Sequence, residues 1–146
     1  MREAEGDRSM THPIKPIATA TVVARQHVVL VKYNAMPDHQ RGWFLPHDLL
    51  NLLEHPTDAA VRALREQLGI ELGAAALALK DVESFKGRDG TWHMSFHHVA
   101  RLPERVELQP SGDLAVAEWF ALERLPARTE VSHHGWGLDT IEKVTS

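Results

Sequence analysis

Residues 43–70 carry the sequence WFLPHDLLNLLEHPTDAAVRALREQLGI, and this stretch decides the fold of the chain. Residues 43–46 form a short apolar segment that ends in proline, which is typical of a short strand. The periodicity further on predicts a helix over residues 58–68, where apolar side chains recur at i, i+3 and i+7. We expect Thr57 to be the N-cap of this helix and Gly69 to end it.

The segments on both sides of this stretch have alternating, β-branched patterns that are typical of strands. The expected strands span residues 17–24, 28–33, 75–85, 91–102 and 116–120. The first two are expected to form a hairpin, and a glycine-rich turn separates the third from the fourth. A short turn or helix at residues 122–126 and a helix at residues 138–144 follow. The order β-β-β-α-β-β-β-α predicts a mixed α/β domain.

Residues 43–70 resemble the Nudix box, G-x5-E-x7-R-E-U-x-E-E-x-G-U, together with its common Trp-x-Leu-Pro lead. Glu54, Arg62, Glu66 and Gly69 stand at box positions, and the spacing between them is intact. The hairpin before the box and the later segment AEWFALERLP also resemble the family, so the resemblance begins near residue 14. It implies an α/β fold of the Nudix type, with a mixed β-sheet sandwiched between helices.

Three box positions depart from the pattern: Asp48 replaces a glycine, and Ala63 and Gln67 replace glutamates. Residues 63, 66 and 67 lie at i, i+3 and i+4, so they share one face of the helix. In the family three glutamates on this face bind Mg²⁺ or Mn²⁺, which prefer carboxylate oxygens. Each lost charge is worth up to about 4 kcal/mol at roughly 4 Å. We therefore expect weak metal binding in the family's usual place.

The resemblance implies two functions that the residues leave open. The first is a Nudix-type hydrolase of a nucleoside diphosphate linked to another moiety, with weakened or atypical metal-dependent activity that uses Mg²⁺ or Mn²⁺. The second is a non-catalytic Nudix-like domain that needs no cofactor and binds a nucleotide-like ligand or a protein partner. The isoprenoid diphosphate isomerases of the family usually carry a catalytic cysteine, and this chain has none.

Four residues are candidate metal ligands. The resemblance implies that Glu66 is the surviving catalytic and metal-binding glutamate, although it could equally be a surface carboxylate paired with Arg62. Asp113 falls where many relatives carry a further metal-binding glutamate, and its segment is also an ordinary turn. His47 and Asp48 could replace the missing ligands for a borderline metal such as Mn²⁺ or Zn²⁺, although adjacent residues more often face different directions.

The remaining candidate residues have structural or substrate-binding roles. Glu54 and Arg62 are expected to tie the leucine-rich loop to the helix, and Gly69 closes the box. Lys32 and Arg41 are candidate phosphate contacts, with a solvated charge as the alternative.

The histidines and aromatic residues give weaker indications of metal binding and of base stacking, respectively. Ten histidines are present, and we expect most of them to be surface or half-buried polar residues. His93 and His97 share a strand face but are separated by roughly 13 Å, too far to bind one ion together. Tyr33, Trp92 and Phe96 could stack on a base, although core packing is the more common role.

Length and composition favour one domain over residues 14–146, preceded by a flexible lead-in at residues 1–13. The net charge of −4, without a Lys/Arg run, gives no reason to expect nucleic-acid or membrane partners. The absence of cysteine excludes disulfides and fits a cytoplasmic location. Homodimers are common in the family, so the resemblance is compatible with a homodimer.

Overall fold

The computed structural model describes residues 13–34, 36, 41–87 and 89–146, so the lead-in predicted at residues 1–13 falls almost wholly outside this set. The strands and helices are β1 (Ile14–Ala24), β2 (His27–Tyr33), β3 (His47–Leu49), α1 (Pro56–Leu68), β4 (Ala78–Lys86), β5 (Trp92–Leu102), β6 (Leu114–Ala121) and α2 (Ser132–Thr145). Short 3-10 turns occur at Ala74–Ala76, Leu122–Arg124 and Arg128–Glu130. The predicted order of strands and helices is confirmed.

The six strands form one mixed sheet in the order β4-β5-β1-β2-β6, and β3 pairs with β1. The central strands β1 and β5 run parallel along their whole length, whereas the other pairs are antiparallel. The end of β1 pairs with β2 in the predicted hairpin, and its earlier part pairs with β3. This arrangement places the segment before α1 against the middle of the sheet.

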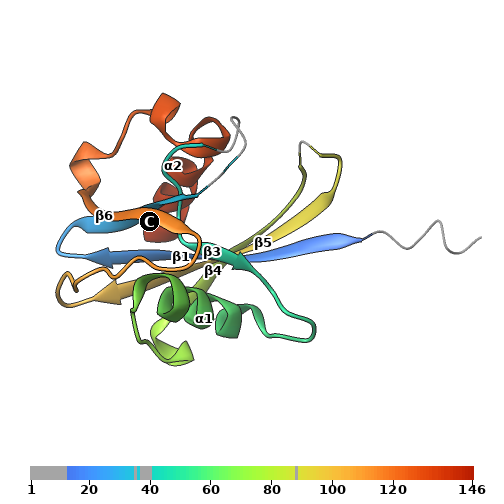
Figure 1. Ribbon diagram of the computed structural model, residues 1–146, viewed down its shortest axis with the longest axis horizontal. Helices are drawn as coiled ribbons and strands as arrows, with labels where there is room; N and C mark the ends of the chain where they lie inside the picture. The colour runs from blue at the N-terminus through green and yellow to red at the C-terminus, as the bar shows by residue number, and fades with distance from the viewer. Residues whose placement is uncertain (1–12, 35, 37–40, 88) are drawn as a thin grey trace, which may run out of the picture.

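The two helices cover opposite faces of the sheet (Figure 1). Alternation along β1 explains this, because successive side chains of a strand point to opposite faces. Ala18, Ala20 and Val22 pack in the core under α1, whereas Val23 packs in the core under α2. The two cores make a three-layer α/β domain, as the resemblance implied.

Helix α1 begins two residues earlier than expected, and its cap differs from the expected one. Thr57 is not the N-cap: the His55 ring Nδ1 accepts a hydrogen bond of 3.1 Å from the backbone N–H of Thr57. The Thr57 hydroxyl instead lies 3.1 Å from Nε2 of buried His98 on β5. Gly69 ends the helix as predicted, in the left-handed conformation at φ 71°.

Two other boundaries differ from expectation. The strand expected at residues 43–46 lies instead at residues 47–49, and Trp43 and Phe44 form only isolated bridges. Helix α2 begins at Ser132, six residues before the expected start. Residues 133–135 have left-handed backbone angles, so its first turn lacks regular helical geometry. Within the part of the chain that the structure describes, no helix is long and apolar enough to cross a membrane.

Candidate functional site

Arg62 on α1 is the centre of an ion-pair cluster. Its Nε and Nη2 donate to the two carboxylate oxygens of Glu54, each at 3.0 Å. Its Nη1 donates to Asp48 Oδ2 at 2.8 Å, and Nη2 also donates to the Leu49 carbonyl. Hydrogen bonding to Arg62 lowers the pKa of Glu54. The cluster ties the leucine-rich loop to α1, which is the structural role expected of Glu54 and Arg62.

Gln67 belongs to a second cluster, at the junction of α1, β2 and β3. Its side-chain nitrogen donates to the His47 carbonyl at 2.8 Å, and its oxygen accepts from the Tyr33 hydroxyl at 2.7 Å. The backbone N–H of His47 donates to the same hydroxyl at 2.9 Å. Burial raises the pKa of Tyr33, so its hydroxyl remains protonated. Both polar atoms of Gln67 are therefore used, one to bind α1 to β2 and the other to bind it to β3.

The other two positions on this helix face differ in exposure. Ala63 is 1% exposed and has no side-chain atom that could bind a metal ion. The Glu66 side chain is 56% exposed and lies 3.7 Å from Arg62 and 3.9 Å from Arg65. A single carboxylate between two guanidinium groups is a poor ligand for a divalent cation, because like charges repel. The residues of this face do not fit the family's metal ions.

Asp113 lies on the loop that precedes β6, at the same end of the molecule as Gln67. Ser111 anchors this loop to α1, because its hydroxyl donates to the Glu66 carbonyl at 2.6 Å and its N–H donates to the Gln67 carbonyl. The charges of Asp48 and Asp113 both raise the pKa of Tyr33. The fold therefore brings the Asp113 loop to the helix end that carries Glu66.

His47 and Asp48 diverge, as expected of neighbours on a strand. The Asp48 carboxylate faces Arg62, and its other oxygen accepts from the Leu49 N–H at 2.8 Å. The His47 ring lies on the opposite side, with Nδ1 2.9 Å from the Leu45 carbonyl and with edge contacts to Tyr33 and Phe44. Burial lowers the pKa of His47, which favours a neutral ring.

A cavity of about 880 Å³ opens between α2 and the sheet face formed by β1, β4 and β5. Its aromatic wall includes Phe44, Phe85 and Trp136. Trp136 stacks on Phe44 with ring centres 5.3 Å apart and meets Phe85 edge-on at 5.1 Å. Concave pockets with an apolar lining and a few polar groups are the usual sites for small ligands. We take this cavity, called the α2 pocket below, as the candidate binding site.

Charged residues also line the α2 pocket. Lys15 and Lys86 both line it, and the Lys15 ammonium forms a 3.1 Å ion pair with Asp89. Hydrogen bonding to the Thr91 backbone, followed by Lys15, lowers the pKa of Asp89 to about 2. The pocket thus combines an aromatic wall with two ammonium groups and with the carboxylates of Glu83, Asp89 and Asp139.

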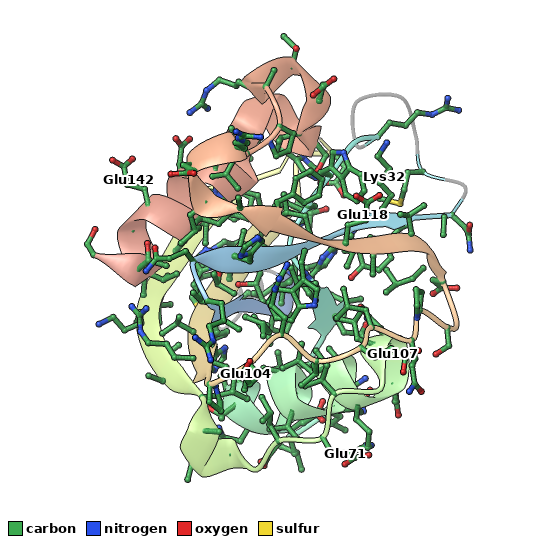
Figure 2. The ribbon with its side chains drawn as sticks, turned by 90° about the vertical axis from the view of Figure 1, so that its left-hand side faces the viewer. Lys32, Glu71, Glu104, Glu107, Glu118 and Glu142 are labelled. Carbon is green, nitrogen blue, oxygen red and sulfur yellow. The ribbon has the colours of Figure 1, made fainter. Side chains whose placement is uncertain are left out.

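The predicted phosphate contacts lie elsewhere. Lys32 Nζ stands 4.6 Å above the Trp43 ring, and Arg41 donates to the Met36 carbonyl at 3.3 Å. Neither residue lines the α2 pocket. Lys32 lies on the α2 side of the sheet, whereas Glu71 and Glu107 lie on the α1 side (Figure 2). The contact of Lys32 and Arg41 with phosphate stays a prediction.

The structure places the other predicted candidates as follows. Tyr33 lines the α2 pocket, whereas Trp92 and Phe96 do not. Six of the eight histidines that the structure describes are exposed or half-buried, as expected of most of them, whereas His97 and His98 are buried. Their strand β5 lies between β4 and β1, and both α1 and α2 pack against it.

Tyr33 and His47, which line the α2 pocket, were candidates from the sequence, whereas Phe85, Glu83 and Trp136 were not predicted. These three residues come from β4 and α2, which have no motif in common. The one signal available was alternation in β4, which places Asp81, Glu83 and Phe85 on the same face.

Comparisons with known proteins agree with this architecture. A family model described as NUDIX domain matches residues 14–137. A MutT NUDIX hydrolase from Burkholderia pseudomallei has a TM-score of 0.76 at 23% identity, covering 91% of this chain and 99% of that chain. The NUDIX domain of Shewanella oneidensis NrtR, complexed with ADP ribose, has a TM-score of 0.73 at 15% identity, covering 94% and 90%.

A third solved structure covers a larger protein. A bifunctional NMN adenylyltransferase/ADP ribose pyrophosphatase from Francisella tularensis, complexed with AMP and a Mn ion, has a TM-score of 0.67 at 20% identity, covering 90% of this chain and 41% of that chain. The comparison with curated proteins found no match. At these identities the solved structures establish the fold.

Proposed function

Because this chain belongs to the NUDIX domain family, whose model matches residues 14–137, we propose that its α2 pocket binds a nucleotide-like ligand without the family's metal-dependent hydrolysis. The observation that carries this proposal is the state of the α1 face. Ala63 is buried, and both polar atoms of Gln67 are hydrogen-bonded to β2 and β3. A pocket of ligand size is present, whereas positions 63 and 67 offer no carboxylate for a catalytic metal ion.

The chemistry of the α2 pocket supports a ligand with a planar ring and an anionic group. Trp136 and Phe85 offer ring faces and edges for a base, and aromatic pairs prefer such offset or edge-on arrangements. Lys15 and Lys86 offer ammonium groups for phosphate oxygens. The similar NUDIX domain that was solved as a complex with ADP ribose also supports a nucleotide-like ligand.

The alternative function is a weak hydrolase of a nucleoside diphosphate linked to another moiety, with Mg²⁺ or Mn²⁺ as cofactor. One observation favours it: the exposed Glu66 carboxylate lies at the helix end to which Ser111 anchors the Asp113 loop. Two carboxylates at one end are fewer than the family's usual set, so this activity would be slow.

Binding is tested by titrating AMP and ADP-ribose into the protein in the presence of EDTA, with isothermal calorimetry as readout. We expect saturable metal-free binding that weakens at least tenfold in Trp136→Leu, because the substitution removes the aromatic ring but keeps an apolar side chain. Trp92→Ala is the matched control, since Trp92 does not line the α2 pocket. Failure of both ligands to bind, or equal binding by both variants, would contradict the proposal.

Hydrolysis is tested separately, by following product release from ADP-ribose and related nucleoside diphosphates with Mg²⁺ or Mn²⁺. We expect no turnover above the uncatalysed reaction. Metal-dependent turnover that disappears in Glu66→Gln would overturn the non-catalytic assignment and establish the alternative.

A further inference from the structure

A cluster of ligand-type side chains lies outside the Nudix box, on the sheet face that α2 covers. Asp81 and Glu83 come from β4, and His97 comes from β5. Each offers one ligand atom, and these atoms all lie within 4.8 Å of one another. Asp81 is paired directly opposite His97 in the antiparallel register. The cluster is therefore held by strand pairing, with no contribution from a loop.

The buried ring of His97 is held in one orientation. Its Nδ1 lies 2.7 Å from the Thr19 hydroxyl, and its Nε2 lies 2.8 Å from Glu83 Oε1. When Nδ1 carries the proton and donates to Thr19, the lone pair of Nε2 faces the carboxylates. Metal-binding histidines are oriented in this way by a partner on their other nitrogen.

The chain Thr19–His97–Glu83 also has the spacing of a nucleophile, a base and an orienting carboxylate. A nucleophilic hydroxyl must reach a substrate, and Thr19 is 0% exposed and does not line the α2 pocket. Burial therefore excludes a covalent role for Thr19, and leaves it as the group that orients His97.

An independent observation at the same place is the hydroxyl of Ser95. It is fully buried and has no hydrogen-bond partner among the described residues. Ser95 is paired directly opposite Glu83, and it lies two residues before His97 on the same face of β5. Buried polar groups nearly always have a partner. A water molecule bound to an ion in this cluster would supply one.

We propose that Asp81, Glu83 and His97 bind a divalent transition-metal ion, with Zn²⁺ as the preferred ion. Tetrahedral Zn²⁺ holds its oxygen and nitrogen ligands at about 2.0–2.2 Å, which brings them closer together than the 4.8 Å limit of the cluster. One imidazole and two carboxylates suit Zn²⁺ or Mn²⁺, whereas Mg²⁺ and Ca²⁺ prefer oxygen alone. Three protein ligands leave a further position for water.

The present partners of the carboxylates define what the ion must displace. Lys143 Nζ lies 3.2 Å from Asp81, and its side chain is 49% exposed, so it can turn toward solvent. Trp136 Nε1 donates to Glu83 Oε1 at 3.1 Å. Since Glu83 and Trp136 both line the α2 pocket, the ion would lie beside this pocket.

The experiment titrates Zn²⁺ alone into EDTA-treated, dialysed protein, with isothermal calorimetry and the visible absorption of Co²⁺ as readouts. We expect one saturable site, an affinity at least tenfold weaker in Glu83→Gln and Asp81→Asn, and loss of the Co²⁺ bands. Glu142→Gln, an exposed α2 carboxylate (Figure 2), is the matched control and should bind as the parent does. The absence of saturable binding, or unchanged affinity in Glu83→Gln, would overturn the proposal.

Two further variants test whether the ion binds at this cluster or on the α1 face. Lys143→Gln removes the competing ammonium and should tighten Zn²⁺ binding severalfold, an effect that a merely structural Asp81 would not produce. Glu66→Gln should leave binding unchanged; if it abolished binding, the ion would belong to the α1 face. The test uses the metal alone, so its result is independent of whether the α2 pocket binds nucleotides.

Discussion

At the residue scale, the alanine at position 63 has two consequences. It removes one of the family's metal ligands, and it places a small side chain in a buried position. Ala63 is 1% exposed and precedes the buried Leu64, so a glutamate at position 63 would begin in a buried part of α1. To restore the family's glutamate at position 63, the protein would need space for the longer side chain as well as the negative charge.

We predict that Ala63→Glu lowers the free energy of unfolding by about 2–4 kcal/mol, because it introduces a buried carboxylate without a partner. The loss should be smaller at low pH, where the carboxyl group is protonated. Urea denaturation at several pH values measures both effects. Ala63→Gln is the neutral control for side-chain volume. If Ala63→Glu with Gln67→Glu kept full stability and bound Mn²⁺ tightly, the face would be open to metal.

Glu54 gives a second prediction at this scale. Its hydrogen bonds with Arg62 lower its pKa, so it contributes stability above its unfolded pKa of about 4.3 and loses that contribution as pH falls through the lower folded value. Glu54→Gln should therefore cost about 1–3 kcal/mol at pH 7, as expected for a lost charged hydrogen bond. Denaturant titrations should give converging stabilities for the two proteins at strongly acidic pH. A constant difference at all pH values would contradict this cause.

At the element scale, the loop between β3 and α1 has two unusual leucines. Leu52 and Leu53 are 91% and 95% exposed, and Leu53 has a φ of 65°. A leucine in the left-handed region is strained, because its Cβ approaches the following carbonyl oxygen. The loop keeps this geometry because Glu54 accepts from the Asn51 N–H at 2.8 Å while it binds Arg62.

We predict that Leu53→Gly stabilises the chain by about 0.5–1 kcal/mol, since glycine adopts this conformation without strain and no packing is lost. Leu52→Gly is the matched control, because Leu52 is equally exposed but does not have a positive φ. It should be neutral or destabilising. Thermal denaturation compares the two variants, and equal shifts would rule out relief of backbone strain.

At the scale of the whole molecule, the α2 layer is attached to the sheet through the backbone around Gly42. The Trp43 N–H donates to the Glu130 carbonyl, and the Ser132 N–H donates to the Trp43 carbonyl. Gly42 has a φ of 115°, and a Cβ built there would stand 2.7 Å from the Glu130 oxygen. This contact sets the position of α2, and with it one wall of the α2 pocket.

Gly42→Ala is therefore expected to destabilise the chain by about 1–3 kcal/mol, through strain and a forced shift of the backbone. It should also weaken ligand binding in the α2 pocket. Gly73→Ala is the control, because a Cβ there meets nothing within 4 Å. Chemical denaturation and ligand titration of both variants provide the measurements. If Gly42→Ala changed neither the free energy of unfolding nor the affinity for the ligand, the contact at Gly42 would not determine the shape of the α2 pocket.

Sequence by itself determined the order of strands and helices and the membership of residues 43–70 in one motif. Those features depend on local periodicity, on Gly69 as a helix stop and on spacing along the chain, all of which a sequence displays directly. It also located the helix face where carboxylates are missing, since i, i+3 and i+4 positions share a face. The sequence was less informative about helix caps and exact boundaries. For example, His55 caps the start of α1, where Thr57 was expected.

Tertiary structure alone decided what the departures from the motif mean. Gln67 became a hydrogen-bonding partner of Tyr33 and His47 because β2 and β3 lie beside α1, which no spacing along the chain reveals. The α2 pocket and the cluster of Asp81, Glu83 and His97 likewise arise where separate elements meet. Strand register and helix placement bring such side chains together, because they are set by packing over the whole sheet.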